Sequence, residues 1–341
     1  PPFEETQTTY NISVQEFNGN PYGQTLFNLP LPSSGTVRPT YACRMEIDND
    51  FLEFETRGLD GLRVTAAHEF HHMVQLGSYG LWSTDKWMHE MSSTYHEVAL
   101  YPDIKDYFQY IRTYMRNPER PMWIWWIWGG DGYELVLWPL FLEKQYDRTL
   151  MRDFWTGMRA VEPMTSMRDA IQARGGDMGN DLCSWARTNF FTGYRSSQLE
   201  TPVYDDAPAL ARTTMYANQE LVAESAKING NLAPTGAMYL RIFRGIDTVS
   251  FVVANTSVAG AIGRRSSGTS YEMEVRASGW DNSFTPLNNG WAYRFTAGEA
   301  NALCLAILEG GSSSAVERDL PFPNPFNPSE FSRMQIPVPR N

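Results

Sequence analysis

The sequence predicts an α+β fold, in which a small N-terminal sheet and a helix-rich region precede a separate all-β domain. Helical periodicity dominates residues 61–195, whereas the segments before and after it carry alternating β-forming residues. At 341 residues the chain is longer than one hydrophobic core usually serves, so two domains are expected. We place the first domain at residues 1–198, a β-sandwich at 199–312 and a Pro-rich linker segment at 313–341.

The elements of the first domain can be assigned in chain order. Residues 8–14 and 41–47 carry β-formers and are predicted strands, the second of them shortly before the first long helix. Helices are expected at 61–75, 85–100, 103–116, 133–146, 148–160, 164–174 and 180–191. Pro139 is expected to kink the fourth helix, because proline cannot donate the backbone hydrogen bond of a helix interior. Helices clustered after a small sheet are typical of an α+β domain.

After about residue 200 the pattern changes to period-two segments. Strands are predicted at 237–243, 248–254, 271–277, 291–297 and 302–308, at a spacing typical of a β-sandwich. This part holds no catalytic constellation, so we expect it to bind, space or protect rather than to catalyse. The Gly/Ser run at 310–314 then predicts a flexible linker.

Composition argues against several classes of protein. The formal net charge is −11 and the pI is about 5.0, so we expect no nucleic-acid partner. The most apolar run, residues 121–128, is far shorter than the roughly 20 residues of a membrane span, so no transmembrane segment is expected. This Trp-rich run belongs in a core, at a domain contact or along a substrate cleft. Cys43, Cys183 and Cys304 are widely spaced, which implies no disulfide framework but leaves one bridge open.

The most informative chemical feature is the H-E-x-x-H run at residues 68–72, inside the first predicted helix. At 3.6 residues per turn, His68 and His72 lie on one helix face, where two imidazoles can bind one Zn²⁺. Glu69 is one step around the helix and can accept a proton from a metal-bound water. His71 is the internal competitor, because His68 and His71 at i, i+3 could also share a metal. The pairing with Glu69 favours His68 and His72.

A catalytic zinc ion needs three protein ligands and one open position. The next predicted helix supplies the third ligand in Glu90, which follows His72 after enough chain for a turn and a returning helix. Glu97 shares the helix face of Glu90 and is a candidate acceptor for the N–H of a ligand histidine. The alternative for both carboxylates is a solvated helix face. We expect His89 and His96 to be bystanders.

Residues 68–72, followed by the Trp-Met-His-Glu segment at 87–90, resemble the gluzincin clan, the thermolysin-like zinc peptidases and their relatives. Over residues 40–195 the chain is similar to a family of predicted secreted bacterial metalloproteases. The resemblance implies a zincin-like catalytic domain, a zinc cofactor and a protein or peptide substrate. The chain departs from the clan beside the third ligand, where His89 and Met91 stand in place of Asn and Gly.

The resemblance also implies roles for two further regions. In part of the clan a Tyr at the start of a later helix stabilises the oxyanion, and Tyr133 follows the glycine-rich turn 129–132 in such a place. The alternative is a buried structural Tyr. In zinc peptidases of this type the strand before the motif helix can bind substrate backbone by edge pairing, which points to residues 41–47. The acidic turn at 48–50 (Asp48, Asn49, Asp50) could hold Ca²⁺ or be a simple turn.

The C-terminal residues indicate where the protein is located. The Pro-Asn-Pro-Phe-Asn-Pro run at 323–328 looks like the opening of the C-terminal sorting domains used in type IX secretion, which implies export and attachment to the outer cell surface. We therefore expect a secreted, gluzincin-like zinc peptidase. One alternative is a cell-surface structural or self-assembling protein that keeps a zincin fold. Another is a zinc hydrolase that cleaves a non-peptide bond.

Overall fold

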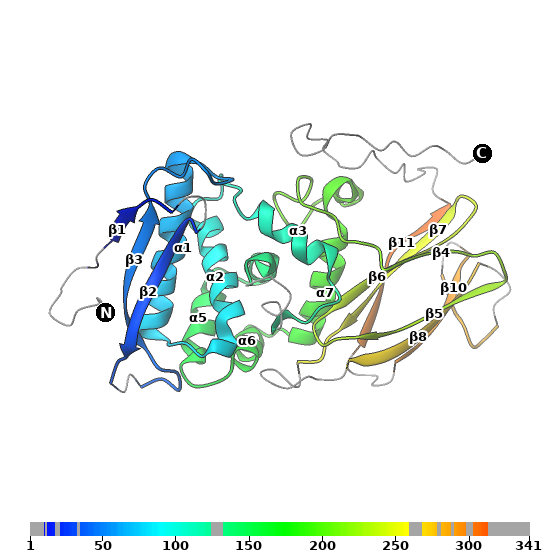
Figure 1. Cartoon of the computed structure of the whole chain (residues 1–341). Coiled ribbons are helices and arrows are strands. Elements are labelled where there is room, and N and C mark those ends of the chain that lie inside the picture. Colours follow the sequence, from blue (N-terminus) through cyan, green and yellow to red (C-terminus); the bar gives the residue numbers. More distant parts are fainter. Residues whose placement is uncertain are drawn as a thin grey trace.

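The fold is mixed α+β, as the sequence predicts, with helices and three sheets. Figure 1 shows the N-terminal sheet at one end of the molecule, the helices in the middle and the other two sheets at the opposite end. The computed structural model describes residues 10, 12–17, 21–32, 35–123, 132–258, 268–277, 281–287, 290–297 and 303–312. The expected C-terminal segment and most of the Trp-rich run lie outside these residues. No helix in the described ranges is long and apolar enough to cross a membrane.

The N-terminal sheet has three strands in the order β1-β3-β2. Strand β3 (Tyr41–Asp48) lies in the centre, parallel to β1 (Ile12–Gln15) and antiparallel to β2 (Gly23–Pro30). The expected strand at 41–47 is therefore confirmed, but its expected role as an edge was wrong, because both of its sides are paired. Strand β2 was not predicted, since its Gly, Asn and Pro residues obscure any alternation. It forms an edge of this sheet.

Helices α1 (Gly58–Ser78) and α2 (Lys86–Leu100) pack against each other beside this sheet. The inner face of β3 and one face of α1 share a core that includes Met45, Ile47 and Met73. α1 continues through Gly77 to Ser78, past the expected end at residue 75, and the turn comes at Gly80. Gly80 has a φ of +81°, and a Cβ there would meet the backbone of Pro39. The 3₁₀ turn Ser83–Asp85 then leads into α2.

The remaining helices follow α2 along the chain. They are α3 (Phe108–Arg116), η3 (Tyr133–Leu135), α4 (Leu137–Gln145), α5 (Thr149–Met158), α6 (Pro163–Gln172), α7 (Met178–Phe190) and η4 (Gly193–Gln198). α3 to α7 pack with α2 around the largest hydrophobic core. The expected kink at Pro139 was wrong. Pro139 lies in the first turn of α4, where its missing N–H costs no helical hydrogen bond, and the break precedes it as a change from 3₁₀ turn to α-helix.

The C-terminal region consists of two four-stranded sheets, β5-β8-β10-β9 and β11-β7-β6-β4. All five predicted strands are confirmed, whereas β4, β5 and the short β9 were not predicted. The strands are β4 (Ala217–Glu220), β5 (Ser225–Leu232), β6 (Ala237–Arg244), β7 (Asp247–Asn255), β8 (Thr269–Arg276), β9 (Thr285–Pro286), β10 (Ala292–Ala297) and β11 (Leu303–Ser312). Buried side chains of both sheets contribute to one apolar core, for example Phe251 on β7 and Met273 on β8.

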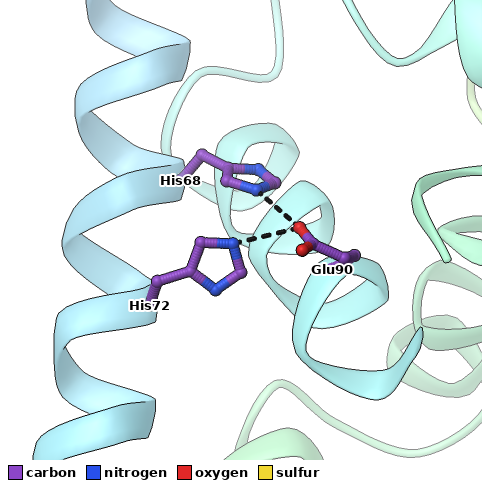
Figure 2. A group of neighbouring side chains, drawn as sticks. All are labelled: His68, His72 and Glu90. Carbon is purple, nitrogen blue, oxygen red and sulfur yellow. Dashed lines mark hydrogen bonds and ion pairs between the residues drawn. The ribbon is translucent and has the colours of Figure 1, made fainter. Parts of the chain in front are cut away.

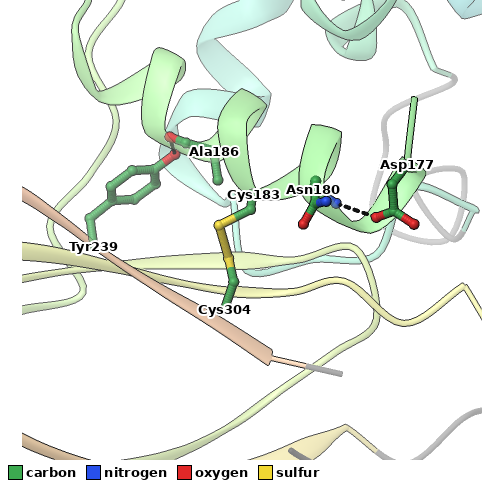
Figure 3. Close-up of a disulfide and its surroundings, with 6 residues drawn as sticks. All are labelled: Asp177, Asn180, Cys183, Ala186, Tyr239 and Cys304. Carbon is green, nitrogen blue, oxygen red and sulfur yellow. Dashed lines mark hydrogen bonds between the residues drawn. A yellow bond between two sulfur atoms is a disulfide. The ribbon is translucent and has the colours of Figure 1, made fainter. Parts of the chain in front are cut away.

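Helix α7 fastens the helices to the C-terminal sheets. A disulfide joins Cys183 on α7 to Cys304 on β11, and the Tyr239 hydroxyl donates a hydrogen bond to the carbonyl oxygen of Ala186 at 2.7 Å (Figure 3). Phe190 on α7 packs in an apolar cluster with Ala186 and Tyr239. The one bridge that the cysteine spacing left open is thus present, and it ties together segments that lie 121 residues apart.

Candidate metal centre

Helix α1 places the two histidines of the H-E-x-x-H run one turn apart. Small and apolar residues let α1 lie against both the sheet and α2, and His68 is buried between them. The His68 and His72 rings have centroids 4.6 Å apart and project toward α2 (Figure 2). The helical spacing therefore produces the predicted pair of imidazoles on one face.

Glu90 on α2 completes the group. Its Oε2 atom lies 3.2 Å from Nε2 of His68 and 3.0 Å from Nε2 of His72 (Figure 2). One donor atom from each of these three residues lies within 4.8 Å of the other two, so the group can hold a metal ion. It is the only such group among the described residues, and it consists of the three ligands predicted from the sequence.

The outer ring nitrogens show why these contacts suit a cation. Nδ1 of His68 lies 2.5 Å from Oε1 of Glu97, and Nδ1 of His72 lies 2.8 Å from Oε1 of Gln75. A neutral imidazole has only one N–H, and these acceptors hold it on Nδ1. The lone pairs of both Nε2 atoms then face the carboxylate of Glu90, an arrangement that a cation between them would stabilise.

The electrostatics of the group also favour positive charge at its centre. Burial opposes protonation of His68, but hydrogen bonds with Glu90 and Glu97 outweigh it and hold the pKa of His68 well above its usual value. Burial opposes ionisation of Glu90 too, yet the neighbouring imidazoles of His72 and His68, through electrostatic interaction and hydrogen bonds, hold the pKa of Glu90 well below normal. The carboxylates that favour a proton on His68 also favour a divalent cation, which would take the place of that proton on Nε2.

Glu69 faces a cavity beside this group. The cavity has a volume of about 530 Å³, and His68, Glu69 and Tyr133 are among the residues that line it. The hydroxyl of Thr25 on β2 donates to Oε2 of Glu69 at 2.7 Å, which fixes the carboxylate between the edge strand and the cavity. The predicted general base thus lines a cavity beside the candidate metal ligands.

Tyr133 lies against His68 in the wall of the same cavity. The two rings are stacked, with centroids 5.2 Å apart and planes 10° apart. Gly132 makes this approach possible, because its φ is +115° and a Cβ there would collide with the backbone of Trp87 on α2. Burial and the nearby carboxylates of Glu90 and Glu69 raise the pKa of Tyr133 well above its usual value, so the phenol keeps its proton.

The three other histidines lie away from the cavity. His71 and His96 stack on each other with centroids 4.6 Å apart, and His89 packs edge-on against Trp155. None of these three belongs to the ligand group, in agreement with the sequence-based expectation.

Gln75 is the functional candidate that sequence reasoning missed on α1 itself. It is fully buried, and its Oε1 accepts from Nδ1 of both His72 and His89, the latter at 3.0 Å. Its Nε2 donates to the carbonyl oxygen of His89 at 3.1 Å, which sets the orientation of the amide because a carbonyl only accepts. Its position three residues after His72 is a signal that could have revealed it. Thr25 is different, since nothing in the sequence connects β2 to Glu69.

The acidic turn after β3 has a different role in the described structure. Asp48 accepts backbone hydrogen bonds from Phe17 through Oδ1 and from Asp50 and Phe51 through Oδ2. Its carboxylate closes the turn and ties it to the end of β1. Calcium binding there remains a prediction.

Comparison with known proteins adds no assignment. No family model matches the chain, and neither the curated proteins nor the solved structures give a match.

Proposed function

We propose that this protein is a zinc-dependent peptidase of the gluzincin type, with a zincin-like fold in its N-terminal part and a β-sandwich after it. The observation that carries the proposal is the convergence of His68, His72 and Glu90 beside a cavity that Glu69 faces. Two imidazole nitrogens and one carboxylate oxygen are a ligand set typical of catalytic zinc, and three protein ligands leave a position open. A zinc ion held there supplies Lewis acidity, which activates water and polarises a carbonyl group.

The side chains around the ligands take distinct roles in peptide hydrolysis. Glu69 accepts the proton of the attacking water and passes it to the leaving amine, while Thr25 holds its carboxylate in place. Tyr133 donates a hydrogen bond to the oxyanion that develops on the scissile carbonyl. Its raised pKa supports this role, because only the protonated phenol can donate.

The edge strand β2 supports a polypeptide substrate. Among the described strands β2 pairs only with β3, which leaves its other side open, and Thr25 places it directly beside Glu69. An extended peptide can add to such an edge through backbone hydrogen bonds. This moves the substrate-binding edge from residues 41–47, where the sequence suggested it, to β2.

Export is part of the proposal. The Cys183–Cys304 disulfide is a feature of proteins that fold in an oxidising compartment, and the Pro-Asn-Pro-Phe-Asn-Pro run resembles a sorting signal. Attachment to the outer cell surface is the location that fits both features.

The test is to incubate the zinc-loaded protein with a proteome-derived peptide library and to map new termini by mass spectrometry. Glu69→Gln is the matched control, because it keeps the size and hydrogen bonding of the side chain but removes the base. Cleavages that occur only with the unmodified protein are the expected result. If both proteins bind one zinc and neither cleaves any peptide, the peptidase proposal is wrong. Trials of ester and amidated sugar substrates then test whether the protein is a hydrolase of non-peptide bonds. If none of these substrates is cleaved, the structural or assembly protein becomes the favoured interpretation.

A further inference from the structure

The cavity beside the metal-ligand group is strongly acidic. Five carboxylates line it, those of Glu53, Glu55, Glu69, Glu97 and Asp106, and no Lys or Arg is among the described residues in its wall. Glu69 and Glu97 already have roles as base and as partner of His68. The three other carboxylates have no part in the proposed chemistry, although they share the same space.

These three carboxylates carry uncompensated negative charge. Glu53 and Glu55 belong to the segment between β3 and α1, are exposed to solvent, and have no ion-pair partner among the described residues. Asp106 is only 5% exposed, and its Oδ1 accepts from the Tyr22 hydroxyl at 3.2 Å and from Nε2 of Gln109 at 2.9 Å. Both donors are neutral, so they orient the carboxylate without cancelling its charge.

Two further features of the wall bear on the ligand, an apolar surface and a hydroxyl without a partner. Phe54 and Val64 line the cavity next to these carboxylates, and the Phe54 ring lies 4.0 Å from that of Tyr22. Thr65, also in the wall, is 5% exposed, and its buried hydroxyl has no hydrogen-bond partner in the described part of the chain. A buried polar group without a partner is costly, so a ligand donor that reached this hydroxyl would be favoured.

We propose that this cavity binds a lysine or arginine side chain of the substrate, so that the enzyme cleaves peptides next to a basic residue. The cationic head lies among Glu53, Glu55 and Asp106, and the aliphatic stem packs on Phe54. A free α-amino group is also a cation, but it has no stem to cover this apolar wall. The inference deepens the proposed function and rests on it for the cleavage step.

The first test measures binding without hydrolysis. Zinc-loaded, full-length Glu69→Gln protein is titrated by calorimetry with the peptides acetyl-Ala-Ala-X-Ala-Ala-amide, in which X is Lys, Arg, norleucine or Glu. Norleucine keeps the stem of Lys and lacks its charge. We expect the Lys and Arg peptides to bind roughly tenfold more tightly than the norleucine peptide, since each partly exposed ion pair contributes up to about fivefold. Equal binding of Lys and norleucine peptides overturns the inference.

Charge-matched variants identify the carboxylates. Glu53→Gln/Glu55→Gln, made in the Glu69→Gln protein, should reduce the preference for Lys over norleucine to about twofold. Glu220→Gln/Glu224→Gln changes the net charge equally at two exposed positions outside the cavity and should leave the preference intact. An equal loss in both variants, or no loss in the first, contradicts the assignment. A norleucine peptide with a free N-terminus provides a further control. If it binds as tightly as the blocked Lys peptide, the cavity recognises an α-amino group and the assignment is contradicted.

Cleavage by the unmodified protein separates this inference from the proposed function. New termini concentrated beside Lys and Arg support both. Cleavage without any preference for basic residues overturns the inference and leaves the peptidase proposal intact. A binding preference for Lys and Arg in the absence of any cleavage supports the basic-side-chain site and contradicts the peptidase.

Discussion

The interface between α1 and α2 and the interface between the two C-terminal sheets are both buried, but they contain opposite kinds of side chain. The first, together with the cavity beside it, is rich in buried polar residues, among them His68, Glu69, Gln75, Glu90, Ser93, Thr94 and Glu97. The second is almost purely apolar, with Leu240, Phe251, Val253, Met273 and Val275 among its members. One interface holds a network of specific hydrogen bonds, and the other holds a close-packed core.

This difference implies that the polar interface supplies function and that the apolar interface supplies stability. A buried polar group costs free energy unless its partners are in place, so a polar interface contributes little stability for its size. Apolar packing contributes about 25 cal/mol per Å² of buried surface and tolerates no cavity. Substitutions at the α1–α2 interface should therefore change chemistry and metal binding, whereas substitutions between the sheets should change the free energy of unfolding.

The largest effect is expected at Glu69. Glu69→Gln should lower kcat/KM for a peptide substrate by about 10²–10⁴-fold, because general-base catalysis contributes about that much. Gln has nearly the same volume and can still accept from Thr25, so thermal stability and zinc content should change little. Steady-state kinetics, thermal melts and metal analysis of the same preparations provide the check. If activity falls only together with zinc content or stability, Glu69 is structural.

Phe251→Ala tests the other interface. Phe251 is fully buried between the sheets, and its truncation should lower the free energy of unfolding by about 3–5 kcal/mol. Zinc binding by the folded protein should be unaffected. Denaturant titration measures the loss, and Ile246→Ala, at an exposed position between β6 and β7, is the control with an expected change within about 0.5 kcal/mol. A loss at Phe251 no larger than that of the control would show that the two sheets do not share a close-packed core.

Removal of zinc should affect the two interfaces unequally. A ligand that binds only the folded state stabilises it by about 2.7–4.1 kcal/mol when its free concentration is 100–1,000 times Kd. We expect a chelator to remove this contribution from the region around α1 and α2. Hydrogen exchange should show faster exchange in these helices and unchanged protection in β6 and β7. A uniform loss of protection would mean that the metal stabilises the whole molecule as one unit.

The sequence reveals those parts of the site that depend on local geometry. His68, His72 and Glu69 follow from the period of one helix, and Glu90 follows from a returning helix of sufficient length. Thr25 could not be predicted, because it acts through an edge strand whose composition hides its structure. The Cys183–Cys304 pairing could not be predicted either, since it depends on how α7 packs against β11.

The acidic cavity shows the same limit. Its carboxylates come from the segment before α1, from α1 and α2 themselves and from the segment before α3, so only the tertiary fold brings them together. The role of Gln75 depends partly on local helix geometry and partly on the tertiary fold. Its place on the His72 face is local, but its hydrogen bonds to His89 and Ser92 depend on the way α2 docks.

Gln75 therefore offers the smallest and most specific test of the polar interface. Gln75→Leu removes the acceptor for Nδ1 of His72 and should weaken zinc binding by about 10–100-fold, the usual effect of losing a hydrogen bond to a ligand histidine. That corresponds to about 1.4–2.7 kcal/mol. Competition with a chromophoric chelator measures the affinity, and kcat at saturating zinc should remain close to that of the unmodified protein.

Gln75→Glu is the matched variant, because it restores an acceptor for His72 while losing the amide that donates to the carbonyl oxygen of His89. We expect it to recover most of the zinc affinity and not the thermal stability. If Gln75→Leu binds zinc as tightly as the unmodified protein, the Ser93 hydroxyl, 3.2 Å from Nδ1 of His72, must hold the ring by itself. The role of Gln75 would then be to join α1 to α2, and the α1–α2 interface would contribute to stability as the sheet interface does.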